Sequence, residues 1–139
     1  MLNRRRKATS APAVLRDLGD VLVIGDMSVD LAAGRLFRFG RELHLRPKEF
    51  HLLCFFMLSP GKIFTREQLW RTLWGQGIDI RIVDMTVSRL RRAINRGHSP
   101  DPIESVRFRG YRFVSDFEQR CEQWKAQGKD RRKLPLPVV

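Results

Sequence analysis

The stretch from Arg81 to Arg96 constrains the fold of this chain more than any other segment. Its aliphatic residues recur at intervals of 4, 3 and 4, and a helix that turns about 100° per residue places them on one narrow stripe. These residues are Val83, Val87, Leu90 and Ile94. The opposite side gathers Arg81, Met85, Ser88, Arg89, Arg92 and Arg96. The pattern predicts a helix that packs through one side, and its arginine face fits either a helix in the DNA major groove or an ordinary solvated helix.

The overall charge indicates the class of partner. The chain has 139 residues, with 27 Lys and Arg against 15 Asp and Glu, which gives a net charge of +12. This excess favours a polyanion: DNA, RNA or an anionic membrane surface. The longest apolar run, Leu52–Leu58, is far too short to span a bilayer, and no apolar stretch of a signal peptide follows the basic start. We therefore expect one globular domain, without membrane association, in the cytoplasm.

Cysteine and histidine positions predict neither a metal centre nor a catalytic site. Cys54 and Cys121 lack metal-ligand spacing and offer no disulfide framework. His51 lies close to Cys54, but no third ligand is near, so Cys54 is interpreted as a core cysteine. The remaining histidines, His44 and His98, are scattered, and no nucleophile–base pair or carboxylate dyad is visible. We expect no metal, no cofactor and no enzymatic activity.

The first half of the chain predicts a leader, a small sheet and a central helix. Residues 1–19 are expected to form a flexible basic leader, either a solvated tail or an arm that adds phosphate contacts. Asp20–His44 alternates apolar and polar residues between turn signals, which predicts an antiparallel meander of three or four strands. Arg46–Ser59 predicts the core helix, buried on more than one face. Its main stripe is expected to comprise Phe50, Leu53, Cys54, Met57 and Leu58.

A second helix precedes the basic helix. Ile63 and Phe64 predict a very short strand, and the following Thr65 and Gln68 fit a capping box that opens a helix ending near Gly75. A short loop then leads to Arg81. Two helices joined by a short loop, the second basic on its outer face, match a helix-turn-helix arrangement.

The segment after the basic helix predicts a wing. Ile103–Val114 has strand character, with Arg109-Gly110 as the expected turn, so it reads as a β-hairpin. Its arginines are Arg107, Arg109 and Arg112. Arginine on such a wing can enter the minor groove of DNA. Ser115–Gly128 predicts a short helix, either docked on the body or forming a partner surface, and residues 129–139 predict a disordered basic tail.

Four motifs in order carry a family resemblance: LHLRPKEFHLL, PGKIFTREQLW, VDMTVSRLRRAI and PIESVRFRGYRF. Together they resemble the winged-helix effector domain of OmpR/PhoB-type response regulators, and the PhoB branch in particular. The resemblance covers Val21 to Val114. It implies an α+β winged helix-turn-helix fold with an N-terminal antiparallel sheet, three helices and a C-terminal hairpin wing. The expected domains are the leader (1–19), the winged-helix domain (20–115) and a short helix with a basic tail (116–139).

The resemblance also implies residue roles. The third helix reads the major groove, through positions that match Arg81, Met85, Thr86, Ser88, Arg89 and Arg91, and Arg92 joins them from its place on the outer face. Helical periodicity alone places Arg91 on the flank, nearer a phosphate, and Thr86 to the side. Arg107 matches the wing arginine. The segment Trp74, Gly75, Gln76, Gly77, Ile78 and Asp79 resembles a loop proposed to touch the RNA polymerase sigma subunit.

Several departures from the family pattern matter. Members usually carry a phosphorylated receiver domain first, whereas Met1 leaves room here for a short leader, so we expect no direct phosphoacceptor control. Phe108 stands where the wing usually has its first glycine, so the wing turn must be rebuilt. The loop before Arg81 is shorter than usual. Arg46 replaces a small capping residue, a loss that costs about 1 kcal/mol.

These observations favour a sequence-specific transcription regulator of two-component type that binds double-stranded DNA. The resemblance implies tandem binding to direct repeats by a protein that is monomeric off DNA. One alternative is a protein-interaction module that binds RNA polymerase or a partner regulator, and another is a non-specific DNA binder. Base contacts would distinguish a sequence-specific regulator from a non-specific DNA binder, because phosphate contacts alone carry no sequence information.

Overall fold

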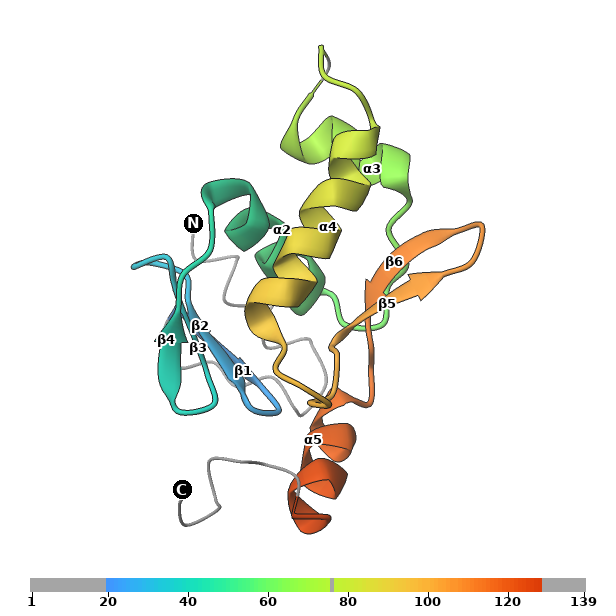
Figure 1. Ribbon diagram of the computed structural model, residues 1–139. Helices are drawn as coiled ribbons and strands as arrows, with labels where there is room; N and C mark the ends of the chain where they lie inside the picture. The colour runs from blue at the N-terminus through green and yellow to red at the C-terminus, as the bar shows by residue number, and fades with distance from the viewer. Residues whose placement is uncertain (1–19, 76, 129–139) are drawn as a thin grey trace.

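The computed structural model describes residues 20–75 and 77–128 (Figure 1). The leader and the tail predicted for residues 1–19 and 129–139 lie outside the described residues. Within the described part, the chain runs from an N-terminal sheet through three helices to a hairpin and a last helix. Among these residues, no helix is both long and apolar enough to cross a membrane.

The N-terminal sheet is the predicted antiparallel meander, with four strands in chain order. These are β1 (Val21–Ile24), β2 (Met27–Asp30), β3 (Arg35–Arg38) and β4 (Arg41–Leu43). Their register aligns Leu22 with Val29, Val29 with Leu36, and Leu36 with Leu43. One apolar row therefore crosses the whole sheet, and this row faces the core because side chains alternate between the two faces.

Helix α2 (Pro47–Leu58) is the central core helix, as predicted. Leu52, Leu53, Phe56 and Met57 are fully buried. Leu58 was expected on the main stripe but is exposed, because it is the last residue of the helix, next to the turn. The backbone N–H of Arg46 donates to the Glu49 carboxylate, so this acidic residue stabilises the helix start in place of the missing small cap.

Helices α3 (Arg66–Leu73) and α4 (Arg81–Ile94) form the predicted helix-turn-helix pair. The capping box is present: the Thr65 hydroxyl accepts from the Gln68 N–H at 3.0 Å, and the Gln68 side chain accepts from the Thr65 N–H at 2.8 Å. All residues of the predicted aliphatic stripe of α4 are buried. The helix ends at Ile94, two residues before Arg96, because the backbone becomes extended at Asn95.

The hairpin consists of β5 (Ile103–Val106) and β6 (Gly110–Phe113). The expected turn at Arg109-Gly110 is only partly right, since residues 107–109 form the turn, which includes Arg109, and Gly110 begins β6. The reason is non-local. Phe64 forms a β-bridge with Tyr111, and a Cβ on Gly110 would lie 2.0 Å from the Phe64 carbonyl oxygen. The predicted short strand at Phe64 therefore exists as a bridge that holds β6 against the body.

Helix α5 (Phe117–Ala126) docks on the body, which confirms the first of the two predicted alternatives. Phe117, Cys121 and Trp124 are buried. The Phe117 ring packs edge-on against Phe113, with centroids 5.4 Å apart. It also lies so close to Gly25 that a Cβ there would be 2.8 Å from the ring, which explains a glycine at this turn.

Candidate nucleic-acid interface

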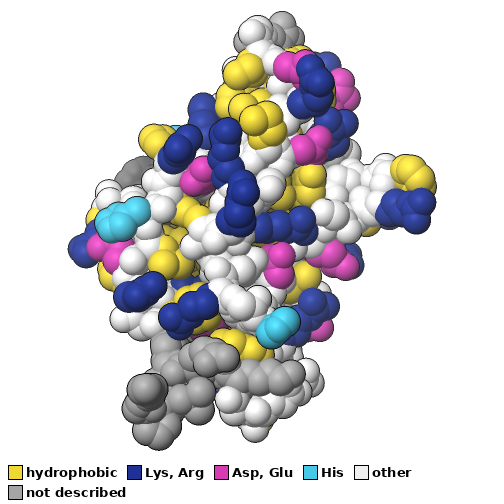
Figure 2. All heavy atoms as spheres, viewed as in Figure 1, with side chains coloured by type: hydrophobic (Ala, Val, Ile, Leu, Met, Phe, Trp, Pro, Cys, Tyr) yellow, Lys and Arg dark blue, Asp and Glu magenta, His cyan; other side chains and the backbone are white. Residues whose placement is uncertain are grey.

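The outer face of α4 carries most of the helix residues predicted to contact DNA. Met85, Ser88 and Arg92 are exposed, and Arg89 is partly exposed. Figure 2 views this face, where Lys and Arg side chains run down the middle of the molecule and reappear at the tip of the hairpin. Because the opposite side of α4 is buried against α2 and α3, the helix is held with its arginine face outward.

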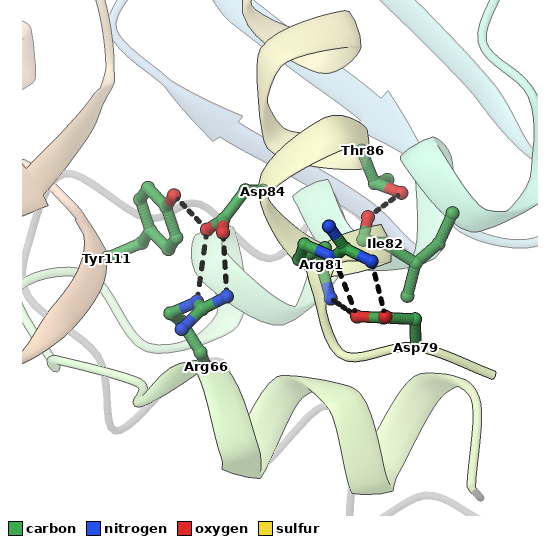
Figure 3. Close-up of polar contacts among 7 residues, drawn as sticks. All are labelled: Arg66, Asp79, Arg81, Ile82, Asp84, Thr86 and Tyr111. Carbon is green, nitrogen blue, oxygen red and sulfur yellow. Dashed lines mark hydrogen bonds and ion pairs between the residues drawn. The ribbon is translucent and has the colours of Figure 1, made fainter. Parts of the chain in front are cut away.

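Thr86 corrects the expected set of base-facing residues. It is 4% exposed, and its hydroxyl donates to the Ile82 carbonyl oxygen at 2.7 Å within the same helix (Figure 3). A buried hydroxyl satisfied by its own helix has no free group to offer a base. The periodicity argument, which placed Thr86 to the side, describes its position better than the family resemblance does.

Arg91 lies on the flank, as periodicity indicated, and serves the fold. Its guanidinium donates to the Ile103 carbonyl oxygen at 2.7 Å and lies 3.3 Å from the Asp101 carboxylate. It thus ties α4 to the start of β5. These two contacts hold the guanidinium against β5, so Arg91 orients the wing and is poorly placed to read a base.

The N-terminal end of α4 carries an exposed ion pair. Asp79 accepts from the Arg81 backbone N–H at 2.8 Å and lies 2.8 Å from its guanidinium (Figure 3). The carboxylate caps the positive end of the helix. Hydrogen bonding from the Arg81 side chain, followed by that from its backbone, lowers the pKa of Asp79 to about 2. Arg81 is therefore present at the interface but already engaged by an acid.

A second carboxylate, Asp84, joins three elements. The Tyr111 hydroxyl donates to it at 2.6 Å from β6, and the Arg66 guanidinium lies 2.8 Å away on α3 (Figure 3). Burial, and then the hydrogen bond to Asp84, raise the pKa of Tyr111 to about 12. This network fixes the wing relative to α4. Sequence reasoning missed it, although the one acid on a basic helix was a usable signal.

The C-terminal end of α4 is held by a buried arginine that sequence reasoning also missed. Arg38 donates to the Ile94 carbonyl oxygen at 2.6 Å, to the Asn95 side chain at 2.8 Å and to the Pro100 carbonyl oxygen at 2.7 Å. Its fourth partner is the Asp26 carboxylate at 2.9 Å. A cation at the last carbonyls of a helix also complements the negative end of the helix dipole.

The hairpin places its arginines in two environments. Arg107 and Arg109 are exposed at the turn. Arg112 lies on β6 opposite Glu104 on β5, and their side chains form an ion pair at 2.9 Å. Arg107 and Arg109 form no ion pair with a described residue, so they are the wing cations that remain available for phosphate.

The candidate polymerase-contact loop has a buried and an exposed part. Trp74 and Gly75 are partly buried, whereas Gly77, Ile78 and Asp79 are exposed. Gln76 lies outside the described residues. The Trp70 indole donates to the Ile78 carbonyl oxygen at 2.9 Å, so the backbone of the loop is anchored to α3.

No cluster of metal-binding side chains occurs among residues 20–75 and 77–128. Cys54 and Cys121 are free thiols, and burial raises the pKa of each to about 12. Both thiols therefore stay protonated near neutral pH, and a protonated thiol is a poor nucleophile and a poor metal ligand.

A four-stranded sheet, a helix-turn-helix pair with a basic outer helix, and a hairpin beside it define an α+β winged helix-turn-helix protein. The family described as "Transcriptional regulatory protein, C terminal" matches residues 40–113. The chain belongs to this family of effector domains, of the OmpR/PhoB type. The predicted resemblance and fold class are confirmed.

Two relatives illustrate the similarity. The phosphate regulon transcriptional regulatory protein PhoB of Rhizobium meliloti is 43% identical over 116 residues, which cover 82% of this chain and 51% of the relative. PhoB of Escherichia coli is 35% identical over 100 residues, which cover 70% of this chain and 44% of the relative. The chain therefore spans about half the length of the curated relatives it matches.

Solved structures give the same fold. The response regulator DrrB, an OmpR/PhoB homologue from Thermotoga maritima, is similar with a TM-score of 0.64 and 33% identity, over 69% of this chain and 45% of that one. The DNA-binding domain of Klebsiella pneumoniae RstA, solved in complex with the RstA box, has a TM-score of 0.61 and 28% identity, over 68% of this chain and 96% of that one.

Proposed function

We propose that this protein is a sequence-specific transcription regulator of two-component type that acts in the cytoplasm on double-stranded DNA. The observation that carries the proposal is the arginine face of α4, which the contacts of Asp84 near one end and Arg38 at the other hold outward, and which is flanked by a wing with two exposed arginines. Membership of the family, and the DNA complex of the similar RstA domain, support this assignment.

The interface divides into reading and anchoring residues. Arg89, Ser88 and Met85 occupy the middle of the exposed face, where side chains meet base edges in the major groove. Arg92 lies one helical turn nearer the C-terminus, within reach of the backbone phosphates. Arg107 and Arg109 add wing contacts. Since phosphate contacts give affinity and base contacts give specificity, these two groups should respond differently to substitution.

The test is selection of bound duplexes from a random pool at about 0.15 M salt, where phosphate contacts alone bind weakly. An enriched motif supports the proposal, and two direct half-sites about one helical turn apart would support tandem binding by a protein that is monomeric in solution. Binding without a motif would indicate a non-specific binder. No binding would favour the protein-interaction alternative.

A matched pair of variants sharpens this test. We expect Arg89→Ala to weaken binding to the selected duplex by about 1–3 kcal/mol and to weaken binding to a scrambled duplex much less. Arg120→Ala is the control, because it removes one exposed arginine from α5, away from α4 and the wing. Equal losses on both duplexes for Arg89→Ala would contradict its role in base reading.

We further propose that the exposed loop before α4 contacts RNA polymerase through its sigma subunit. Ile78 is an exposed aliphatic side chain, and the acidic Asp79 follows it. The two residues could supply an apolar and an acidic contact to the sigma subunit. Ile78→Ser should leave DNA binding intact and lower activated transcription in a purified system. Unchanged activation by this variant would exclude Ile78 from such a contact.

A further inference from the structure

The tip of the wing carries an unusual side chain. Phe108 is 94% exposed, far more than any other large hydrophobic residue that the structure describes. It lies at the end of a hairpin that projects away from the helices (Figure 1). The Arg107 guanidinium lies 5.1 Å from the ring centroid, but this contact leaves the ring almost wholly in solvent. Folding therefore buries almost none of this aromatic ring, and the ring adds little to the stability of the domain.

The backbone at Phe108 is also unfavourable for this residue type. Its φ is +65°, in the left-handed region that glycine and asparagine occupy most easily and bulky residues rarely adopt. A single exposed apolar side chain on a surface needs no explanation. An aromatic ring that is exposed and also held in a strained turn is different, because folding alone would favour a smaller residue at this position on both counts.

The hairpin that carries the ring is held in place on the body of the protein. Its β6 strand is held close to the turn by the Phe64–Tyr111 bridge and by the bond from Tyr111 to Asp84 on α4. Figure 2 shows a hydrophobic side chain together with Lys or Arg at this tip, on the face that carries the arginines of α4. A rigid apolar ring between two cations, on the same face as a basic helix, fits DNA better than an apolar protein pocket, because neither cation has an acidic partner among the described residues.

We propose that Phe108 inserts into the minor groove as an apolar wedge that partly unstacks one base step. This inference rests on the proposed function, with α4 in the adjacent major groove. Arg107 and Arg109 would lie along the flanking phosphates. Apolar wedges of this kind kink DNA toward the major groove, and pyrimidine–purine steps unstack most easily. The wing would therefore select for deformable steps, in addition to the bases that α4 reads.

The experiment uses the full chain and duplexes of the selected motif with 2-aminopurine placed at successive positions under the wing. Unstacking raises 2-aminopurine fluorescence. We expect the natural protein to raise it at one step. Phe108→Asn, which suits the left-handed backbone, should abolish the rise and bind the selected duplex about tenfold more weakly. Phe108→Leu keeps an apolar wedge and should retain part of the rise.

Two controls separate this role from others. Phe108→Asn should keep the salt dependence of binding, because both neighbouring arginines remain, and it should unfold at the same or a higher temperature. Leu58→Asn removes another exposed apolar side chain, on α2, and should leave fluorescence and affinity unchanged. The wedge proposal is contradicted if the natural protein binds the selected duplex without any rise in 2-aminopurine fluorescence, or if Phe108→Asn gives the same rise. In both cases the proposed function stands. If the natural protein enriches no duplex at all, the wedge proposal and the proposed function are both contradicted.

Discussion

At each end of α4 an arginine pairs with an aspartate, in opposite environments. At the C-terminal end, the side chains of Arg38 and Asp26 are 0% and 2% exposed. At the N-terminal end, those of Arg81 and Asp79 are 78% and 56% exposed. The buried pair also bonds to two backbone carbonyls from the end of the helix and the following loop, whereas the exposed pair bonds only within its own turn.

The contrast separates two tasks of one helix. A buried charge must keep its partners, since an unpaired charge in the interior is costly, so the C-terminal end is fixed in place. An exposed pair is worth little and exchanges readily with water or phosphate. The buried pair thus fixes the C-terminal end of α4, whereas Arg81 at the N-terminal end can exchange an internal acid for the phosphate of DNA.

The largest effect is expected at the buried end. Arg38→Met leaves Asp26 buried without its cation and three oxygen acceptors without their donor. We expect the free energy of unfolding to fall by about 3–5 kcal/mol, as measured by urea denaturation. Arg35→Met is the matched control on the same strand, because its ion pair with Glu42 is partly exposed and should contribute at most about 1 kcal/mol. Equal losses for the two variants would contradict the view that burial makes the Arg38–Asp26 pair the stronger contact.

Local rules predicted much of this fold. The stripe of α4, the capping box at Thr65 and the meander each follow from short-range periodicity or turn chemistry, which the sequence displays directly. Arg38 could not be found in this way, because its partners Ile94 and Pro100 lie 56 and 62 residues away. Its only sequence signal is that it shares the inward face of β3 with Leu36, an odd place for a charge.

The errors at the interface have the same origin. Thr86 is buried because α4 packs against two helices, so the buried arc is wider than the aliphatic stripe alone suggested. The Arg91 side chain bonds to β5. The wing turn differs from the expected one because Phe64 forms a bridge with β6. In each case a tertiary contact, invisible in local sequence, decided which face of a correctly predicted element was free.

An intermediate effect is expected at Tyr111, which links the wing to α4. Tyr111→Phe removes the hydroxyl donor to Asp84, which keeps its pair with Arg66, so we expect a loss of about 1 kcal/mol in unfolding free energy. The pKa of Tyr111, raised to about 12, gives a pH signature. Above its ordinary value near 10 the unfolded chain loses the phenolic proton first, so stability should fall as pH rises from about 10 to 12.

The measurement is direct because the chain has a single tyrosine. Tyrosinate absorbance during an alkaline titration reports this residue alone, and urea denaturation at about pH 8 and pH 11 should show a smaller decrease for Tyr111→Phe than for the natural protein. A tyrosinate transition near the ordinary value in the folded protein would contradict the link between wing and helix.

The smallest effect, and the one with opposite sign, is expected at the exposed end. Asp79→Asn keeps a capping side chain but releases Arg81, so affinity for DNA should rise about two- to fourfold at moderate salt, with a salt slope steeper by about one. Asp116→Asn is the matched control: it removes the same charge from the pair with Arg120 on α5. Equal gains for the two variants in binding titrations would mean that net charge alone is responsible.

Because the pKa of Asp79 is about 2, its carboxylate stays charged from about pH 5 to 8, and this group should add no pH dependence to DNA binding in that range.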